Sequence, residues 1–239
     1  MRTIGILGGM SWESSIHYER IMNTEVRRRL GGSHSADLLI RSYDFAAVEA
    51  LQEADDWDGA GELLVADAAA LEAAGAELIV LATNTMHRVA DRIEAAITVP
   101  FLHLADTTAQ AVLAAGVRRV ALLGTRYTME ADFYRGRLER HGLDVVIPDE
   151  AGRELVHSVI YEELVRGIVS DDSRTAVVEV VASLVAGGAT GVIAGCTEIE
   201  LLLGPDDLAG LGDGAGPEAV AWFPTAELHA LAAVDRALE

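Results

Sequence analysis

Residues 3–9 read Thr-Ile-Gly-Ile-Leu-Gly-Gly, and residues 119–125 read Arg-Val-Ala-Leu-Leu-Gly-Thr. Each is a short apolar run that ends at glycine, which is typical of a buried strand followed by a tight turn. A second pair is also similar: residues 76–85 (Ala-Glu-Leu-Ile-Val-Leu-Ala-Thr-Asn-Thr) and residues 190–198 (Thr-Gly-Val-Ile-Ala-Gly-Cys-Thr-Glu). Because the two pairs are similarly spaced along the chain, the sequence predicts two related halves.

Short apolar runs alternate with longer amphipathic stretches through the rest of the chain. The predicted strands are 3–7, 38–41, 78–81, 101–103, 120–123 and 191–194. The predicted helices are 13–29, 58–74, 89–96, 107–115, 130–141, 154–165, 174–186 and 225–238. Strands that alternate with helices of this length indicate βαβ units and parallel sheets, so the expected fold class is α/β.

The internal repeat predicts two α/β lobes. We expect the first lobe over residues 1–99, completed by 218–239, and the second over 100–217, with a surface loop over 204–217 that is rich in Gly, Asp and Pro. Open α/β sheets bind ligands beyond the carboxyl ends of their strands. The repeated turns are therefore expected to converge on one cleft, with Thr83 and Cys196 on opposite walls.

The composition excludes several classes of protein. There are 38 acidic against 18 basic residues, a formal net charge of −20, and no dense basic cluster, which disfavours nucleic-acid and anionic-membrane partners. No apolar run approaches the roughly 18 residues of a membrane span, and the first residues are interpreted as a strand, so a cytoplasmic protein is expected. The 18 basic residues are all arginine. That excludes a pyridoxal-phosphate Schiff base and a P-loop lysine.

Cys196 is the single cysteine, so neither an internal disulfide nor a multi-cysteine zinc site can form. It follows a buried strand at the start of a predicted turn or helix, where N–H dipoles lower the pKa of a thiol. This position indicates a functional thiolate. The alternative is a small buried hydrophobic residue, which describes most lone cysteines.

Three further turns could hold an anion. Thr83-Asn84-Thr85 offers backbone N–H groups, hydroxyls and an amide, and the alternative is an ordinary helix cap. Gly8-Gly9-Met10-Ser11 lets the backbone approach a ligand, with Ser11 as a possible cap. Gly124–Thr128 could hold a carboxylate through its hydroxyls and Arg126. His87 and His229 lack a metal-ligand spacing, so no metal site is expected.

Four segments in this order resemble the aspartate/glutamate racemase family of the Asp/Glu/hydantoin racemase superfamily. They are Gly5–Ser14, Thr83–His87, Gly124–Met129 and Gly195–Ile199. The resemblance implies two Rossmann-like lobes with pseudo-twofold symmetry, an active site in the interlobe cleft, no cofactor, and a last helix that returns to the first lobe. It also implies a racemase with two cysteines on opposite faces of the substrate α-carbon.

The chain departs from that pattern at the first cysteine. The second cysteine is present as Cys196, whereas the first position is Thr83. A hydroxyl has no accessible anion at neutral pH, so Thr83 cannot act as the base and can at most pass a proton. The resemblance places the second cysteine on the side that deprotonates the L-enantiomer, so we expect strong bias to that enantiomer. Arg166 lies near the sequence position where the family usually has a substrate-facing lysine. Pro224 lies where relatives typically have an aspartate.

The resemblance also implies the binding residues. Backbone and side chains of seven residues would hold the carboxylates and the amino group: Met10, Ser11, Asn84, Thr85, Thr125, Thr128 and Thr197. Glu198, which follows Cys196, would orient the site or hydrogen-bond a partner rather than act as a base. The implied partner is a small dicarboxylic amino acid, aspartate or glutamate, and a homodimer is one option because relatives are often dimers.

Two other readings stay open. Loss of one cysteine also fits a single-cysteine decarboxylase or isomerase of the same superfamily. A degraded catalytic pair would instead fit a non-catalytic binding protein for an acidic metabolite.

Overall fold

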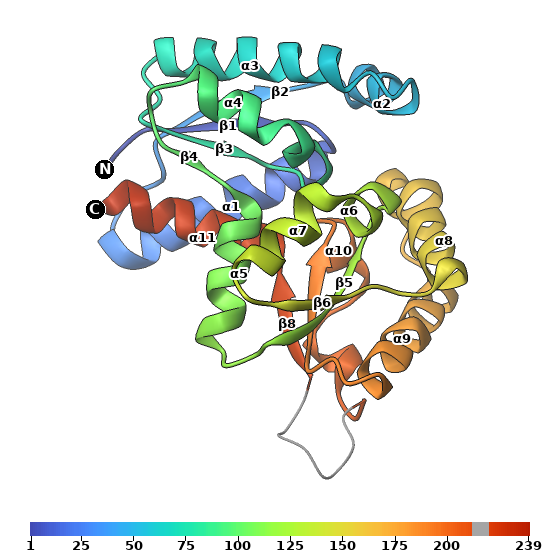
Figure 1. Cartoon of the computed structure of the whole chain (residues 1–239). Helices are drawn as coiled ribbons and strands as arrows, with labels where there is room; N and C mark the ends of the chain where they lie inside the picture. Colours follow the sequence, from blue (N-terminus) through green and yellow to red (C-terminus); the bar gives the residue numbers. More distant parts are fainter. Residues whose placement is uncertain (212–219) are drawn as a thin grey trace. The chain divides into compact units, whose positions relative to one another are not determined.

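The structure is a computed structural model that describes residues 1–211 and 220–239 (Figure 1). It divides into two compact units: Met1–Thr107 with Ala226–Glu239, and Thr108–Thr225. Both changes of unit lie later along the chain than the expected boundaries after residues 99 and 217. Part of the predicted loop 204–217, namely 212–217, lies outside the described residues; its described part contains a short helix, η4 (Pro205–Leu208).

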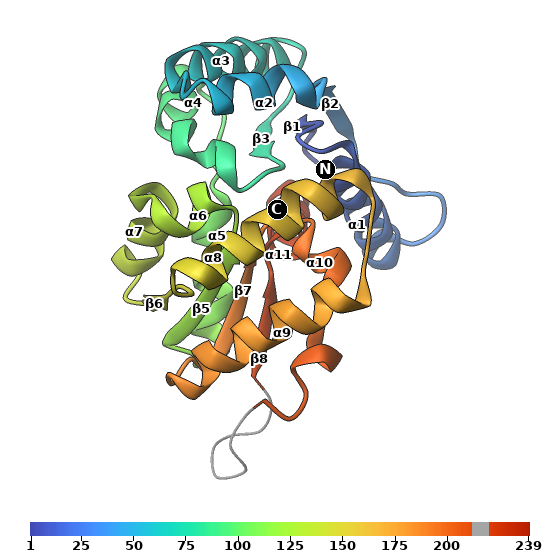
Figure 2. The same ribbon diagram turned by 90° about the vertical axis from the view of Figure 1, so that its right-hand side faces the viewer.

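The first unit is built on a parallel four-stranded sheet of order β2-β1-β3-β4. Its strands are β1 (Ile4–Gly8), β2 (Leu38–Ser42), β3 (Leu78–Leu81) and β4 (Phe101–Leu102). Its helices are α1 (Trp12–Leu30), α2 (Phe45–Glu53), α3 (Trp57–Ala73), η1 (Thr85–Val89), α4 (Ala90–Ala96) and α11 (Thr225–Leu238). One apolar cluster packs α2, α3 and α4 on the sheet, and another packs α1 and α11 on its other face, giving three layers (Figures 1 and 2).

The second unit has the parallel sheet order β6-β5-β7-β8. Its strands are β5 (Arg119–Gly124), β6 (Asp144–Val146), β7 (Gly191–Gly195) and β8 (Ala221–Pro224). Its helices are α5 (Leu104–Ala114, which begins in the first unit), α6 (Arg126–Glu130), α7 (Asp132–Arg140), α8 (Glu150–Ser158), η2 (Val159–Glu163), η3 (Leu164–Arg166), α9 (Asp171–Ala186) and α10 (Ile199–Leu202). An apolar cluster packs α8 and α9 against β5 and β7.

The two sheets share one topology, because adding four to each strand number of the first order gives the second. The strands β1 and β5 are therefore equivalent, as are β3 and β7. This confirms the α/β class with two parallel-sheet lobes and the internal repeat that residues 3–9 and 119–125 indicated.

Strand pairing explains where the unit boundaries differ from those expected. The short strand β4 pairs with β3, which keeps residues 100–107 in the first unit. The strand β8 pairs with β7, so the return to the first unit begins only at Ala226. A two-residue strand carries too little periodicity to reveal the sheet that it joins.

Several elements were not predicted in the form that the structure has. Helix α2 was not predicted, although Asp44 caps it by accepting a hydrogen bond from the Ala46 N–H. Strand β6 pairs only with β5 and is too short to show alternation. The helix expected over 154–165 begins at Glu150, because Asp149 accepts from the Gly152 N–H, and it changes to π-helical geometry at Val159.

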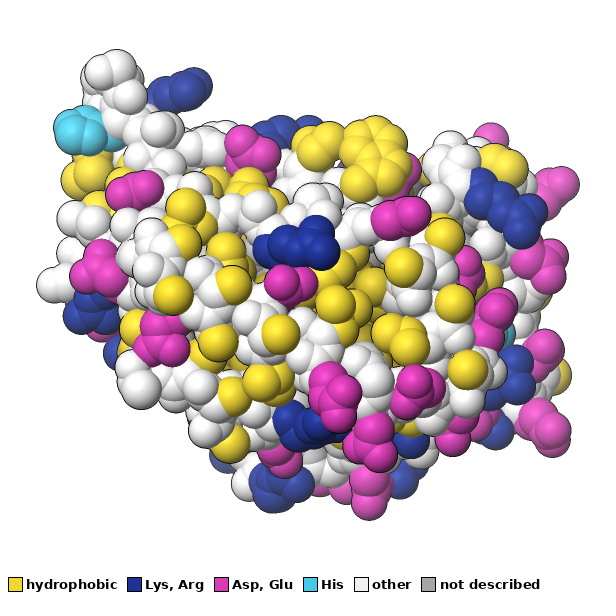
Figure 3. All heavy atoms as spheres, turned by 90° about the horizontal axis from the view of Figure 1, so that it is seen from above, with side chains coloured by type: hydrophobic (Ala, Val, Ile, Leu, Met, Phe, Trp, Pro, Cys, Tyr) yellow, Lys and Arg dark blue, Asp and Glu magenta, His cyan; other side chains and the backbone are white. Residues whose placement is uncertain are grey.

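Acidic side chains are dispersed over the face of the molecule that Figure 3 shows. Figure 3 shows acidic and basic side chains intermixed over one face, with small apolar side chains between them. Among the described residues, no helix combines the length and the apolar character that crossing a membrane requires.

We predict that Gly9→Ala strongly destabilises the protein. Gly9 has φ +83°, and a Cβ there would lie 2.3 Å from the Tyr43 nitrogen and 2.5 Å from its carbonyl oxygen. Gly116→Ala is the matched control, since Gly116 has φ +74° with nothing within 4 Å of such a Cβ. The control should lose about 1 kcal/mol of unfolding free energy from backbone strain. Gly9→Ala should lose about 3 kcal/mol or more by urea denaturation. Equal losses would contradict the steric argument.

We predict that His229 makes the unfolding free energy depend on pH. Burial lowers its pKa from 6.5 to about 4. The folded protein therefore holds His229 neutral, and its contribution to stability is complete above pH 6.5 and is lost as the pH falls toward 4. The loss over that window should be about 3 kcal/mol.

His229→Gln is the matched variant, because its amide can keep the hydrogen bond that the His229 Nε2–H donates to the Leu102 carbonyl at 2.8 Å. Urea titrations of both proteins at several pH values should show a shallower slope for the variant. Identical slopes would assign the pH dependence to other groups.

Candidate functional site

The first half-site consists of the turns after β1 and β3 in the first unit, Gly8–Ser11 and Thr83–Thr85. The strands pair in parallel with Leu7 opposite Leu81, and the Ala82 N–H donates to the Leu7 carbonyl at 2.9 Å. Because parallel neighbours end at the same edge of a sheet, the two turns are adjacent. The predicted residues Met10, Ser11, Thr83, Asn84 and Thr85 are therefore brought to one edge, and all are buried.

Serine side chains fix the glycine turn. The Gly9 N–H donates to Ser15 Oγ at 2.6 Å, and a Cβ at Gly8 would lie 2.5 Å from the same oxygen. Glycine is required there because the backbone runs directly against Ser15. The expected capping role of Ser11 is wrong: its side chain makes no capping bond to α1, and its Oγ lies 3.4 Å from Ser14 Oγ.

The Thr83–Thr85 turn is held by His87, for which the sequence predicted no role at the site. His87 Nδ1 lies 2.7 Å from the Thr83 carbonyl oxygen. Asn84 precedes η1 but makes no side-chain capping bond to that helix, so the ordinary cap interpretation does not account for it. The spacing of four residues between Thr83 and His87 was the available signal, since it fits one helical turn.

The second half-site consists of Thr125–Thr128 and Cys196–Glu198 in the second unit. Gly124 pairs with Gly195, so the residues after these strands start at the same level. Thr128 packs over both glycines, and its Cγ2 lies 3.1 Å and 3.2 Å from the Cβ positions that they lack. Thr125 caps α6 by accepting from the Thr128 N–H at 3.3 Å. The close fit leaves no room for side chains at either glycine.

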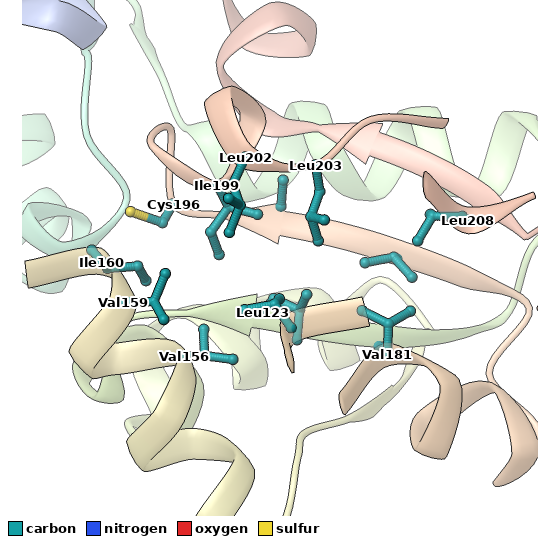
Figure 4. Packing of buried hydrophobic residues seen from close by; sticks show 14 of the residues in the cluster. Leu123, Val156, Val159, Ile160, Val181, Cys196, Ile199, Leu202, Leu203 and Leu208 are labelled. Carbon is teal, nitrogen blue, oxygen red and sulfur yellow. The ribbon is translucent and has the colours of Figure 1, made fainter. Parts of the chain in front are cut away.

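Cys196 is paired with a carboxylate. Its Sγ–H donates to Glu198 Oε2 at 3.0 Å, and the Thr197 hydroxyl donates to the same oxygen at 2.8 Å. All three residues are buried. Figure 4 shows Cys196 at one end of the apolar cluster near Ile160, with its sulfur directed away from the cluster. The Cys196 side chain therefore packs against apolar residues, and its sulfur is hydrogen-bonded to a polar group.

The expectation of a lowered thiol pKa is wrong. Burial and then the charge of Glu198 raise the pKa of Cys196 well above its usual range, and the hydrogen bond to Glu198 acts in the same direction. Backbone N–H groups of Glu198 and Ile199 oppose this shift but contribute less. Helix α10 begins only at Ile199 and has four residues, which is too short for a large dipole. Cys196 is therefore a protonated thiol at neutral pH.

The two basic residues considered for the site, Arg126 and Arg166, are engaged elsewhere or exposed. Arg126 lies 3.6 Å from Glu154, and its backbone N–H donates to His157 Nδ1 at 3.3 Å. Arg166 ends η3 and is exposed.

Pro224 ends β8 opposite Ala194, beside the strand that leads to Cys196. No group of three or more His, Cys, Asp or Glu side chains within residues 1–211 and 220–239 could hold a metal ion.

Comparison with known proteins gives consistent matches. A protein of Yersinia pestis described as a candidate Asp/Glu racemase has 49% identity and a TM-score of 0.90, with all of both chains covered. An aspartate racemase homologue from Pyrococcus horikoshii OT3 has 35% identity and a TM-score of 0.84, also with all of both chains covered.

The broad specificity amino-acid racemase RacX of Bacillus subtilis is 26% identical over 147 residues, which are 61% of this chain and only 64% of that protein's length. The sequence profile of the Asp/Glu/hydantoin racemase family matches residues 7–211. The parallel-sheet topology agrees with these matches. The chain therefore belongs to the Asp/Glu/hydantoin racemase family.

Proposed function

We propose that the protein is a cofactor-independent racemase of an acidic amino acid, aspartate or glutamate. The observation that carries the proposal is the Cys196–Glu198 pair, a protonated thiol hydrogen-bonded to a carboxylate at the end of β7. Thr83 occupies the equivalent place after β3. The proposal adopts the expectation, drawn from the repeat and the resemblance, that Thr83 and Cys196 act on opposite faces of the substrate α-carbon.

The relatives support this substrate class. Their names describe Asp/Glu racemases or a racemase of broad specificity. The proposal uses no metal and no organic cofactor, and the absence of lysine from the sequence excludes a pyridoxal-phosphate Schiff base. A cytoplasmic location and a homodimer are part of the proposal and rest on composition and resemblance.

The proposed chemistry starts at the thiol. Cys196 first passes its S–H proton to Glu198, which creates a thiolate and a neutral carboxylic acid. The thiolate then takes the α-proton of the L-amino acid, and the electron pair of the C–H bond stays on the substrate as a carbanion. Glu198 serves as the proton acceptor that a buried thiol of raised pKa needs before it can act as a base.

The opposite face decides whether the centre inverts. Inversion needs a proton from the side of Thr83, where a hydroxyl replaces the thiol. An alkoxide does not form at neutral pH, so Thr83 passes a proton only if it is replaced at the same time through a hydrogen-bonded chain. Return of the proton from Cys196 is easier and restores the L-enantiomer. The enzyme should therefore exchange the α-proton faster than it inverts.

Neutral donors bind the substrate in this proposal. The Thr83–Thr85 turn and Met10–Ser11 supply backbone N–H groups and hydroxyls on one side, and Thr125, Thr128 and Thr197 supply them on the other. Backbone N–H groups at such turns favour carboxylates. The negative Glu198 near the thiol favours the cationic amino group of the substrate.

A single-cysteine decarboxylase is the second candidate. The raised pKa of Cys196 leaves the thiol protonated, which is the state that protonates an enediolate from one face. Release of carbon dioxide from a disubstituted malonate, lost in Cys196→Ala, would favour this candidate over the racemase.

We predict α-proton exchange without equivalent inversion. L- and D-glutamate and L- and D-aspartate are incubated with the protein in deuterated water, NMR follows loss of the α-proton, and chiral chromatography follows inversion. The L-enantiomers should exchange faster than they invert. Cys196→Ala should lower exchange by about 100-fold or more, the usual scale of a general base.

Thr83 variants test the other side. Thr83→Val should retain exchange of the L-substrate and lose inversion, whereas Thr83→Ser should retain both. Thr83→Cys should raise inversion, because it supplies a second thiol. Inversion by Thr83→Val at the wild-type rate would overturn the role of Thr83.

Absence of exchange from all four substrates, with tight binding unchanged in Cys196→Ser, would favour a binding protein.

We predict that Glu198→Gln lowers the pKa of Cys196. The substitution removes the carboxylate charge that raises this pKa but leaves the thiol buried. Because Cys196 is the only cysteine, the ultraviolet absorbance of the thiolate reports it alone in a pH titration. Cys196→Ala gives the baseline. The variant should titrate at lower pH than the wild type and exchange the substrate α-proton more slowly, since its proton acceptor is gone. An unchanged thiol titration would show that burial alone sets the pKa.

A further inference from the structure

Three histidines of the first unit form a buried cluster, His87, His103 and His229, which we call the histidine cluster. Each is at most 3% exposed. The ring centroids of His87 and His103 are 4.5 Å apart, and those of His87 and His229 are 6.1 Å apart. The three side chains come from η1, the residue after β4, and α11. The cluster therefore joins three segments that are far apart in sequence.

Each imidazole of the cluster binds the backbone where β4 ends and α5 begins. His229 Nε2 lies 2.8 Å from the Leu102 carbonyl oxygen. The Leu104 N–H donates to His87 Nε2 at 3.2 Å, and the Ala105 N–H donates to His103 Nδ1 at 3.1 Å. This stretch is the last part of the first unit before the chain enters the second.

The tautomer of His87 follows from the hydrogen bonds at its two ring nitrogens. Because Nε2 accepts from the Leu104 N–H, that nitrogen carries no proton, and the ring proton is on Nδ1. Nδ1–H then donates to the Thr83 carbonyl at 2.7 Å. One neutral side chain thus ties the backbone of Thr83 to the first residue of α5.

We propose that His87 is a positioning residue for Thr83. Its hydrogen bond fixes the Thr83 peptide, and the peptide fixes the direction of the hydroxyl that serves the second proton transfer. Displacement of a reacting group by about 1 Å costs about 100-fold in rate, so a small rotation of this turn is enough to impair the transfer. The kinetic part rests on the proposed function, whereas the hydrogen bond itself does not.

The test compares two amides at position 87. His87→Asn places an amide N–H near the position of Nδ1 and can keep the bond to the Thr83 carbonyl. His87→Gln places its amide near Nε2 and can keep the bond from the Leu104 N–H but not the one to Thr83. His229→Gln is the matched control, because it removes an imidazole from the same cluster that has no hydrogen bond to Thr83.

The readout is the ratio of inversion to α-proton exchange with an L-substrate. His87→Gln should lower this ratio by about 10-fold or more, since exchange depends on Cys196 and inversion on Thr83. His87→Asn should restore most of it, and His229→Gln should leave it unchanged. Equal ratios for His87→Gln and His229→Gln, or no restoration by His87→Asn, would overturn the proposal.

A second readout needs no turnover and no variant. Nitrogen-15 NMR of the wild-type protein should show His87 as the neutral Nδ1–H tautomer, with scalar coupling across the hydrogen bond to the Thr83 carbonyl carbon. An Nε2–H tautomer or an imidazolium at neutral pH would overturn the positioning role. If the wild type shows this bond but no α-proton exchange, the proposed function fails while the hydrogen bond of His87 to Thr83 stands.

Discussion

Parallel pairing of the two central strands in each sheet is the constraint on which the rest depends. In the second unit Gly124 lies opposite Gly195, so the turns that carry Thr125 and Cys196 start at the same level. In the first unit Leu7 lies opposite Leu81, with the same effect for the glycine turn and Thr83. Antiparallel pairing would send these turns to opposite edges of each sheet. Strand direction therefore sets where the residues of the proposed chemistry lie, and the side chains at those positions then decide what they can do.

The local environment of Cys196 shows how burial changes the meaning of a residue. A thiol after a strand suggests an activated thiolate when only the sequence is considered. In the structure the same thiol is buried against apolar residues and donates to a carboxylate, and both effects favour the protonated form. The proton of the pair is on the Cys196 sulfur, and Glu198 is the group that can accept it. A racemase would first transfer this proton from Cys196 to Glu198, whereas a decarboxylase would donate it from Cys196 to the enediolate.

Much of the fold could be predicted from sequence because the central strands are apolar runs followed by polar or glycine-containing turns, and three of them, β1, β5 and β7, end at glycine. The site residues were found by the same rule, since each follows such a run. The strand predicted over 101–103 is present as β4, but the sequence assigned β4 and β8 to the wrong lobes, because strands of two to four residues on a sheet edge show little periodicity. It also could not reveal the thiol pKa or the role of His87, since both depend on neighbours brought in by folding. The chain shows a histidine four residues after Thr83, but only the structure shows its bond to the Thr83 carbonyl.

The return of α11 to the first unit has a consequence for the order in which the chain can fold during translation. Residues of α11, among them Ala226, Ala230 and Val234, cover one face of the first sheet. These residues are synthesised after the whole second unit, which is continuous over Thr108–Thr225. The middle of the chain is thus the first part to possess all of its own core. Until the last helix emerges, the nascent N-terminal sheet has α1 but not α11 packed on that face of β1 and β3.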